Sequence, residues 1–121
     1  MFACVMIRAS RDAPQNYADR QSLIDALTPY DQADVVGHWS NEQMLMVQTL
    51  TWNTAESRHE AAPETCKETG RVIVSWVRLD NRTELCAQLG LSDQVTLTDP
   101  QIILASHRKW GEDCADKLEG P

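Results

Sequence analysis

The run RVIVSWV at residues 71–77 constrains the fold of this chain more than any other segment. Its apolar and β-branched side chains fall on both faces of an extended strand, whose side chains alternate from residue to residue. Such a segment predicts a central strand in a sheet that is covered on both sides. Shorter apolar runs at residues 4–7, 34–40 and 44–50 predict three further strands, the last two forming a hairpin with a turn at residues 40–43.

Helical signals follow mainly in the second half of the chain. Asp80 or Asn81 can cap a helix that stops at Gly90, and Asp99 followed by proline predicts the N-cap and first turn of another helix, which ends near Trp110. Further predictions are a helix at residues 17–27, a long loop at residues 51–70 and a short helix at residues 112–118. Strands early and helices late favour an α+β class.

Size and charge narrow the function classes. The 121 residues predict one domain, and 11 basic against 18 acidic residues give a net charge of −7. We therefore expect no nucleic-acid partner, because non-specific binding to phosphates needs a basic surface. The longest apolar runs are too short to span a bilayer, and the MFACVMIR start lacks the features of a signal peptide. A cytoplasmic protein without a membrane partner is expected.

The cysteines and histidines do not have the spacing of a metal site. No C-x-x-C pair occurs, and the three histidines are scattered. We expect no metal and no disulfide framework, with the cysteines acting as small reduced hydrophobes. These cysteines are Cys4, Cys66, Cys86 and Cys114.

A few residues are candidates for chemistry, and each also has a structural interpretation. Cys4 can act as an N-terminal nucleophile only if three preceding residues are removed to free its amine; otherwise it is a strand cysteine. Asp99 either holds a ligand amine or caps its helix. Trp52 and His59 either line a pocket or decorate a loop. Two further groups are interpreted structurally. The first is an ion-pair network made by Arg78, Asp80 and Arg82. The second is a set of aromatic anchors of the core or an interface, made by Trp39, Trp76 and Trp110.

The motifs LDNRTEL at residues 79–85, DPQIILASHRKWGEDC at residues 99–114 and LEG at residues 118–120 resemble those of a known family. It is the class II glutamine amidotransferase domain at the N-terminus of asparagine synthetase-like proteins. The loop LTWNTAESRHE at residues 50–60 is also similar to the segment that precedes the family's central strand. The resemblance covers about the last seventy residues well and the first fifty loosely.

The resemblance implies an N-terminal-nucleophile (Ntn) hydrolase-like fold, an αββα sandwich of which residues 1–121 form a single partial domain, about the first half. It implies that an ATP-dependent synthetase domain, absent from this chain, is its partner. The parent would be a ligase of asparagine biosynthesis, similar to the glutamine-hydrolysing asparagine synthase type, or to β-lactam synthetases and lasso-peptide cyclases. The parent would use ATP and magnesium, and no cofactor is expected in this chain.

The chain departs from the family at the positions that carry glutaminase chemistry. Phe2 occupies the place of the nucleophilic cysteine, residues 48–50 (QTL) lack the arginine that holds the substrate carboxylate, and residues 76–78 (WVR) replace the Asn-Gly-Glu turn. Asp99 alone matches the family's aspartate for the substrate amine. We expect a degenerate domain that acts as a structural scaffold and has no catalytic residue.

Two alternatives remain open. Removal of residues 1–3 would expose Cys4 and give an active glutamine amidotransferase. The chain could instead be a stand-alone interaction module, dimeric through the uncovered edge and face of its sheet.

Overall fold

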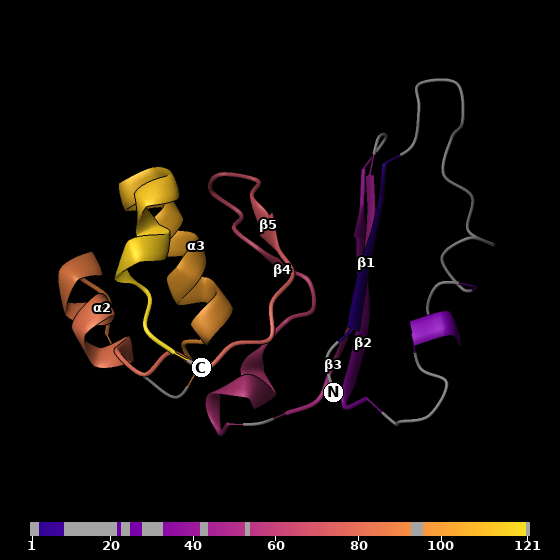
Figure 1. Cartoon of the computed structure of the whole chain (residues 1–121), viewed down its shortest axis with the longest axis horizontal. Helices are drawn as coiled ribbons and strands as arrows, with labels where there is room; N and C mark the ends of the chain where they lie inside the picture. The colour runs from indigo at the N-terminus through magenta and orange to yellow at the C-terminus, as the bar shows by residue number, and fades with distance from the viewer. Residues whose placement is uncertain are drawn as a thin grey trace. The chain divides into compact units, whose positions relative to one another are not determined.

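A computed structural model describes residues 3–8, 22, 25–27, 33–41, 44–52, 54–92 and 96–120. These residues contain both helices and small antiparallel sheets, which confirms the predicted mixed α+β class (Figure 1). The chain divides into two compact units. The sheet unit is Met1–Thr51 with Ala61–Pro63, and the helical unit is Trp52–Glu60 with Glu64–Pro121.

The sheet unit contains three antiparallel strands. They are β1 (Ala3–Arg8), β2 (Val35–Ser40) and β3 (Met44–Leu50), arranged in the order β1-β3-β2. The backbone N–H of Asn41 donates to the carbonyl of Met44 at 2.9 Å at the end of the β2–β3 hairpin. The predicted strands at residues 4–7, 34–40 and 44–50 are thus confirmed, together with their hairpin.

The central position of β3 explains its burial. Its residues from Leu45 to Leu50 are all buried, which requires cover on both faces of the strand because successive side chains alternate. On β2, Gly37 lies against the backbone of Ala62, since a Cβ added to it would stand 1.7 Å from the Ala62 carbonyl oxygen. Only glycine permits this approach, so Gly37 fixes where the segment Ala61–Pro63 crosses the strand.

The prediction of a central strand at residues 71–77 is wrong. Only β5 (Val72–Ile73) is a strand there, and it pairs with the equally short β4 (Glu64–Thr65). Trp76 is 49% exposed, so the segment is not covered on both sides. The apolar pattern indicates only that these side chains tend to be buried. A strand also needs a partner strand to hydrogen-bond with, and β4 offers only two residues for pairing.

The predicted long loop at residues 51–70 is more structured than expected. It contains β4 and a single 3-10 helix, η1 (Glu56–His59), whose first residues are held by local hydrogen bonds. The other residues of the segment that the structure describes, 51–70 without 53, have no regular structure. The prediction is therefore right for most of the loop and wrong for these two short elements, which are too short to produce a hydrophobic period.

Two helices and a 3-10 helix complete the helical unit. They are α2 (Arg82–Leu89), α3 (Asp99–Trp110) and η2 (Gly111–Lys117), and α3 packs against both of the others. As predicted, Gly90 ends α2, in the left-handed conformation with φ of 69°. The buried core of this unit consists of Leu79, Leu85, Cys86 and Ile102.

Part of the predicted helix at residues 17–27 can be compared with the structure. Ser22 and residues 25–27 are helical, and the other positions of that prediction lie outside the described residues. Of the helices that the structure describes, none has the length and apolar content needed to cross a bilayer.

Candidate functional site

The start of α3 carries Asp99, the residue that the sequence indicates as a candidate to hold a ligand amine. Thr98, not Asp99, is the N-cap: its hydroxyl accepts from the backbone N–H of Gln101 at 3.4 Å, and the Gln101 side chain accepts from the Thr98 N–H at 3.0 Å. This reciprocal pair is a capping box. The prediction of Asp99 as the N-cap is therefore wrong by one residue, and the Asp99 carboxylate is left to make other contacts.

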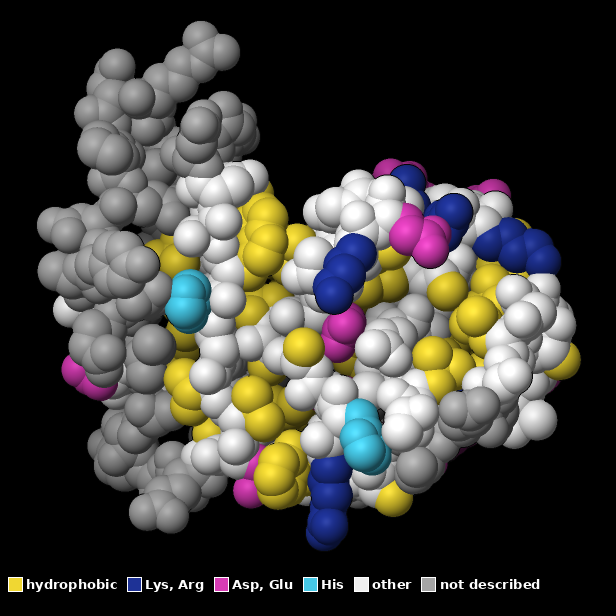
Figure 2. Space-filling model, turned by 180° about the vertical axis from the view of Figure 1, so that it is seen from behind, with side chains coloured by type: hydrophobic (Ala, Val, Ile, Leu, Met, Phe, Trp, Pro, Cys, Tyr) yellow, Lys and Arg dark blue, Asp and Glu magenta, His cyan; other side chains and the backbone are white. Residues whose placement is uncertain are grey.

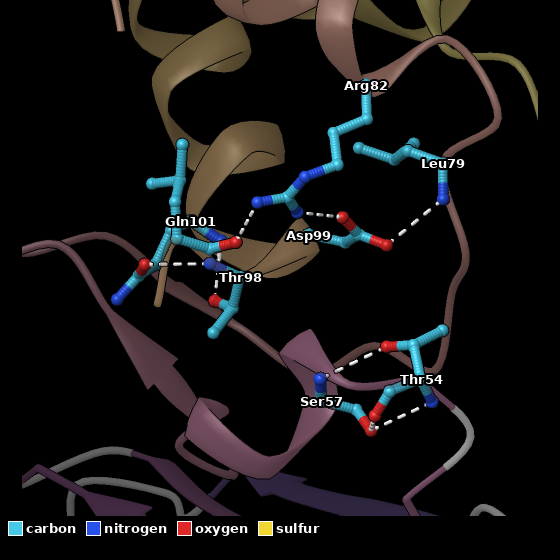
Figure 3. Close-up of polar contacts among 8 residues, drawn as sticks. Thr54, Ser57, Leu79, Arg82, Thr98, Asp99 and Gln101 are labelled. Atoms are coloured by element: carbon cyan, nitrogen blue, oxygen red, sulfur yellow. Dashed lines mark hydrogen bonds and ion pairs between the residues drawn. The ribbon is translucent and has the colours of Figure 1, made fainter. Parts of the chain in front are cut away.

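Those contacts occupy both carboxylate oxygens of Asp99 (Figure 3). Oδ1 lies 2.6 Å from a guanidinium nitrogen of Arg82, and Oδ2 accepts from the backbone N–H of Leu79 at 3.1 Å. The Asp99 side chain is 6% exposed and that of Arg82 is 12% exposed. Arg82 also donates to the carbonyl of Leu97, so the same guanidinium joins the start of α2 to the loop before α3. A buried ion pair needs such extra hydrogen bonds to offset the loss of solvation.

Asn81 ties the same turn to the end of the chain. Its side-chain amide donates to the carbonyl of Lys117 at 2.7 Å, and its oxygen accepts from the N–H of Glu119 at 3.1 Å. The N–H of Asp80 donates to the carbonyl of Glu119 at 2.7 Å. A Cβ on Gly120 would stand 2.2 Å from the carbonyl oxygen of Arg78, so the LEG motif lies directly against the residues of the LDNR motif. The motifs that carry the family resemblance therefore contact one another.

The predicted ion-pair network of Arg78, Asp80 and Arg82 is confirmed for Arg78 and Asp80 and is wrong for Arg82. Arg78 pairs with Asp80 at 3.1 Å on the surface, where both side chains are more than half exposed. Arg82 turns inward to Asp99 instead. Figure 2 shows basic and acidic side chains interspersed on the surface of the helical unit, and a second exposed pair there joins Arg108 to Glu68.

Two further carboxyl groups belong to the surroundings of Asp99. Glu64 of β4 is buried, and its carboxylate accepts from the Gln101 side chain at 3.5 Å. Burial, reinforced by the negative charges of Asp99 and Glu64, raises the pKa of the half-buried Glu60 carboxyl to about 7. The Glu60 carboxyl therefore stays protonated well above its ordinary range, and its two forms are about equally populated near pH 7. Sequence reasoning missed Glu64 because no motif contains it, and it gave no role to Glu60, the last residue of the segment 50–60.

Cys4 lies within β1, in register with Gln48 of β3. It is the second residue of a strand whose backbone is paired along its whole length. Gln48, the first residue of the QTL stretch at residues 48–50, is 2% exposed. Phe2 lies outside the described residues. Trp76 is 49% exposed, so of the two predicted roles, an anchor of the core or of an interface, the core role is wrong.

The remaining cysteines differ in burial. Cys86 and Cys114 are buried and reduced, as expected of small hydrophobes, whereas Cys66 is partly exposed. Hydrogen bonds from Thr69 lower the pKa of the Cys66 thiol. Within the part of the chain that the structure describes, no three His, Cys, Asp or Glu side chains converge as metal ligands.

The predicted pocket residues Trp52 and His59 do line one cavity, which also includes Thr54, Ala55 and Arg58. This cavity belongs to the loop that begins the helical unit and does not include Asp99. Comparison with known proteins adds nothing to these two sites, since no family model, curated protein or solved structure matches the chain.

Proposed function

We propose that this chain is the degenerate glutaminase-like domain of an ATP-dependent, amide-forming protein of the asparagine synthetase type, and that it acts as a cytoplasmic structural scaffold. The observation that carries the proposal is the burial of Asp99, whose side chain is 6% exposed and whose two oxygens already contact Arg82 and the Leu79 N–H. A substrate amine would have to reach this enclosed carboxylate beside the positive charge of Arg82, and displacing Arg82 would leave a buried donor unsatisfied.

The sequence departures support the same proposal. Phe2 stands in the place of the nucleophile, and residues 48–50 (QTL) lack the arginine. The LDNRTEL and LEG motifs have a structural role in this chain. Asn81 and Gly120 hold residues 117–120 against the turn before α2. Retention of stabilising residues beside loss of catalytic ones is what a scaffold domain requires. The proposed fold is the Ntn αββα sandwich, completed by strands outside this chain.

The partner in this proposal is a synthetase domain that binds ATP and magnesium. A reading frame that continues past codon 121 and encodes the S-G-G-x-D-S pyrophosphate-binding loop would support it. A frame that continues into an unrelated sequence would contradict it.

An assay of glutamate release from L-glutamine tests the loss of glutaminase activity. We expect no release above the buffer rate from the intact chain, nor from a chain that begins at Cys4. Release by either form that disappears in the Cys4→Ser variant would overturn the proposal and favour an amidotransferase matured at Cys4. Intact mass before and after the assay shows which N-terminus is present.

A further inference from the structure

The loop that contains Trp52 is fixed in shape by hydrogen bonds between two hydroxyl residues. The N–H of Thr54 donates to the Ser57 hydroxyl at 3.1 Å, and the N–H of Ser57 donates to the Thr54 hydroxyl at 3.0 Å. The Ser57 hydroxyl also donates to the Thr54 carbonyl at 2.7 Å, and Ser57 is fully buried (Figure 3). These bonds hold η1 as a single turn, so the residues that follow Ser57 project from a defined position.

Arg58, which follows Ser57, lies over an aromatic ring. Its guanidinium carbon is 5.9 Å from the centre of the Trp52 ring, within the range of a cation–π contact, and Trp52 is 42% exposed. This contact places the guanidinium beside the indole, and its N–H groups can donate to an anion. Both residues line an open cavity of about 700 Å³, together with Thr54, Ala55 and His59.

Arg58 differs in its ion-pair partners from the other arginines that the structure pairs. Arg78, Arg82 and Arg108 each form an ion pair with a carboxylate. Among the described residues, no ion pair involves Arg58, although Glu56 and Glu60 are close to it in sequence. The chain has a net charge of −7, yet this cavity is lined by an arginine that lies over a tryptophan. The arrangement indicates a binding site for a negatively charged ligand group.

We propose that the Trp52–Arg58 cavity binds a small planar organic carboxylate. The carboxylate pairs with the guanidinium fork of Arg58, and the planar body of the ligand lies along the exposed indole of Trp52. The His59 ring and the Thr54 hydroxyl line the same cavity and supply hydrogen-bonding groups at its wall. Asp99 does not line this cavity, and the existence of the site does not depend on the proposed scaffold function.

Binding of benzoate to the intact chain, followed by the NMR signal of the Trp52 indole N–H, tests the proposal. The chain has four tryptophans, so a Trp52→Phe variant identifies the signal by its loss. Benzoate is expected to shift this signal to saturation. Benzamide has the same ring without the charge, and acetate has the charge without the ring. We expect both to bind at least about tenfold more weakly, since each lacks one of the two contacts.

Substitution of Arg58 separates its role from general charge effects. Arg58→Met keeps the length of the side chain and is expected to weaken benzoate binding about tenfold or more, with an unchanged unfolding midpoint because Arg58 is exposed. Arg78→Met removes an exposed arginine elsewhere in the helical unit and is expected to leave benzoate binding unchanged. Equal binding of benzoate and benzamide, equal loss in both variants, or no saturable shift of Trp52 would overturn the proposal.

Discussion

The sheet unit and the helical unit are stabilised in different ways. In the sheet unit, β3 is paired on both edges by backbone ladders, and its side chains are buried along nearly its whole length. In the helical unit, polar side chains join segments that are far apart in sequence. The bonds made by Asp99, Arg82 and Asn81 link residues between 15 and 38 positions apart.

This difference determines how each unit responds to substitution. A backbone ladder distributes its stabilisation over many similar residues, so single side chains on an exposed face matter little. A connection made by one buried guanidinium and one carboxylate concentrates its effect in two residues, because removal of either leaves the other charged and buried. The helical unit should therefore lose more stability from a single polar substitution than the sheet unit does.

The largest effect is expected from Arg82→Met. This change leaves the Asp99 carboxylate buried without its ion-pair partner, and it should lower the free energy of unfolding by about 3–5 kcal/mol. Arg78→Met, in the exposed pair with Asp80, is the matched control and should cost at most about 1 kcal/mol. Urea unfolding followed by circular dichroism measures both, and equal losses in the two variants would show that the buried pair has no special role.

The sheet unit should be most sensitive at Gly37. Gly37→Ala places a Cβ on the Ala62 carbonyl oxygen, and the required shift of the backbone should cost about 1–3 kcal/mol. Ser40→Ala, at an exposed position of the same strand, is the control and should change stability by less than about 0.5 kcal/mol. A Gly37→Ala chain as stable as the control would mean that the Ala61–Pro63 segment does not lie against β2.

Glu60 gives the helical unit a dependence on pH. Its folded-state pKa of about 7 lies above the ordinary value of 4.5, so folding favours the protonated form. The contribution to stability is therefore complete below about pH 4.5 and is lost as the pH rises through 7. Because solvent screens this half-exposed group, the loss should be only about 1–2 kcal/mol.

Glu60→Gln removes the titration and isolates this contribution. Relative to the native chain, the variant should be more stabilised at pH 8 than at pH 5, as measured by denaturant unfolding at both values. The same difference between the two chains at pH 5 and pH 8 would show that Glu60 does not titrate in this range.

The smallest effect concerns a local contact within the helical unit. Thr98→Ala removes the hydroxyl of the capping box and should cost about 1 kcal/mol. Thr96→Ala, at an exposed position two residues earlier, should leave the unfolding midpoint unchanged. Thermal unfolding of the two variants distinguishes the cap from a general effect of removing a threonine near α3.

The sequence predicted the elements that rest on local signals. The hairpin of β2 and β3 follows from two apolar runs and a polar turn, and the end of α2 follows from Gly90. The predicted N-cap of α3 was wrong by one residue, because aspartate before proline is a strong signal for a helix start. The T-x-x-Q spacing of Thr98 and Gln101, a capping-box pattern, competes with it and determines the structure.

The sequence could not predict contacts that depend on tertiary position. Residues 71–77 have the composition of a central strand, yet only two of them pair with β4. The partners of Asp99 lie 17 and 20 residues away, and no periodic pattern connects them. The cavity of Trp52 and His59 was one of two interpretations of these residues. The contact of Arg58 with Trp52 could not be predicted, because it depends on how the loop folds.

Calorimetric titration of L-glutamine into the intact chain and into Asp99→Asn, with thermal unfolding of both, tests the structural role of Asp99 most directly. If the carboxylate is committed to Arg82 and Leu79, millimolar glutamine gives no saturable heat with either chain. Asp99→Asn then lowers the unfolding midpoint, because Arg82 loses its ion-pair partner. Saturable binding to the native chain that is lost in an equally stable Asp99→Asn chain would contradict this account.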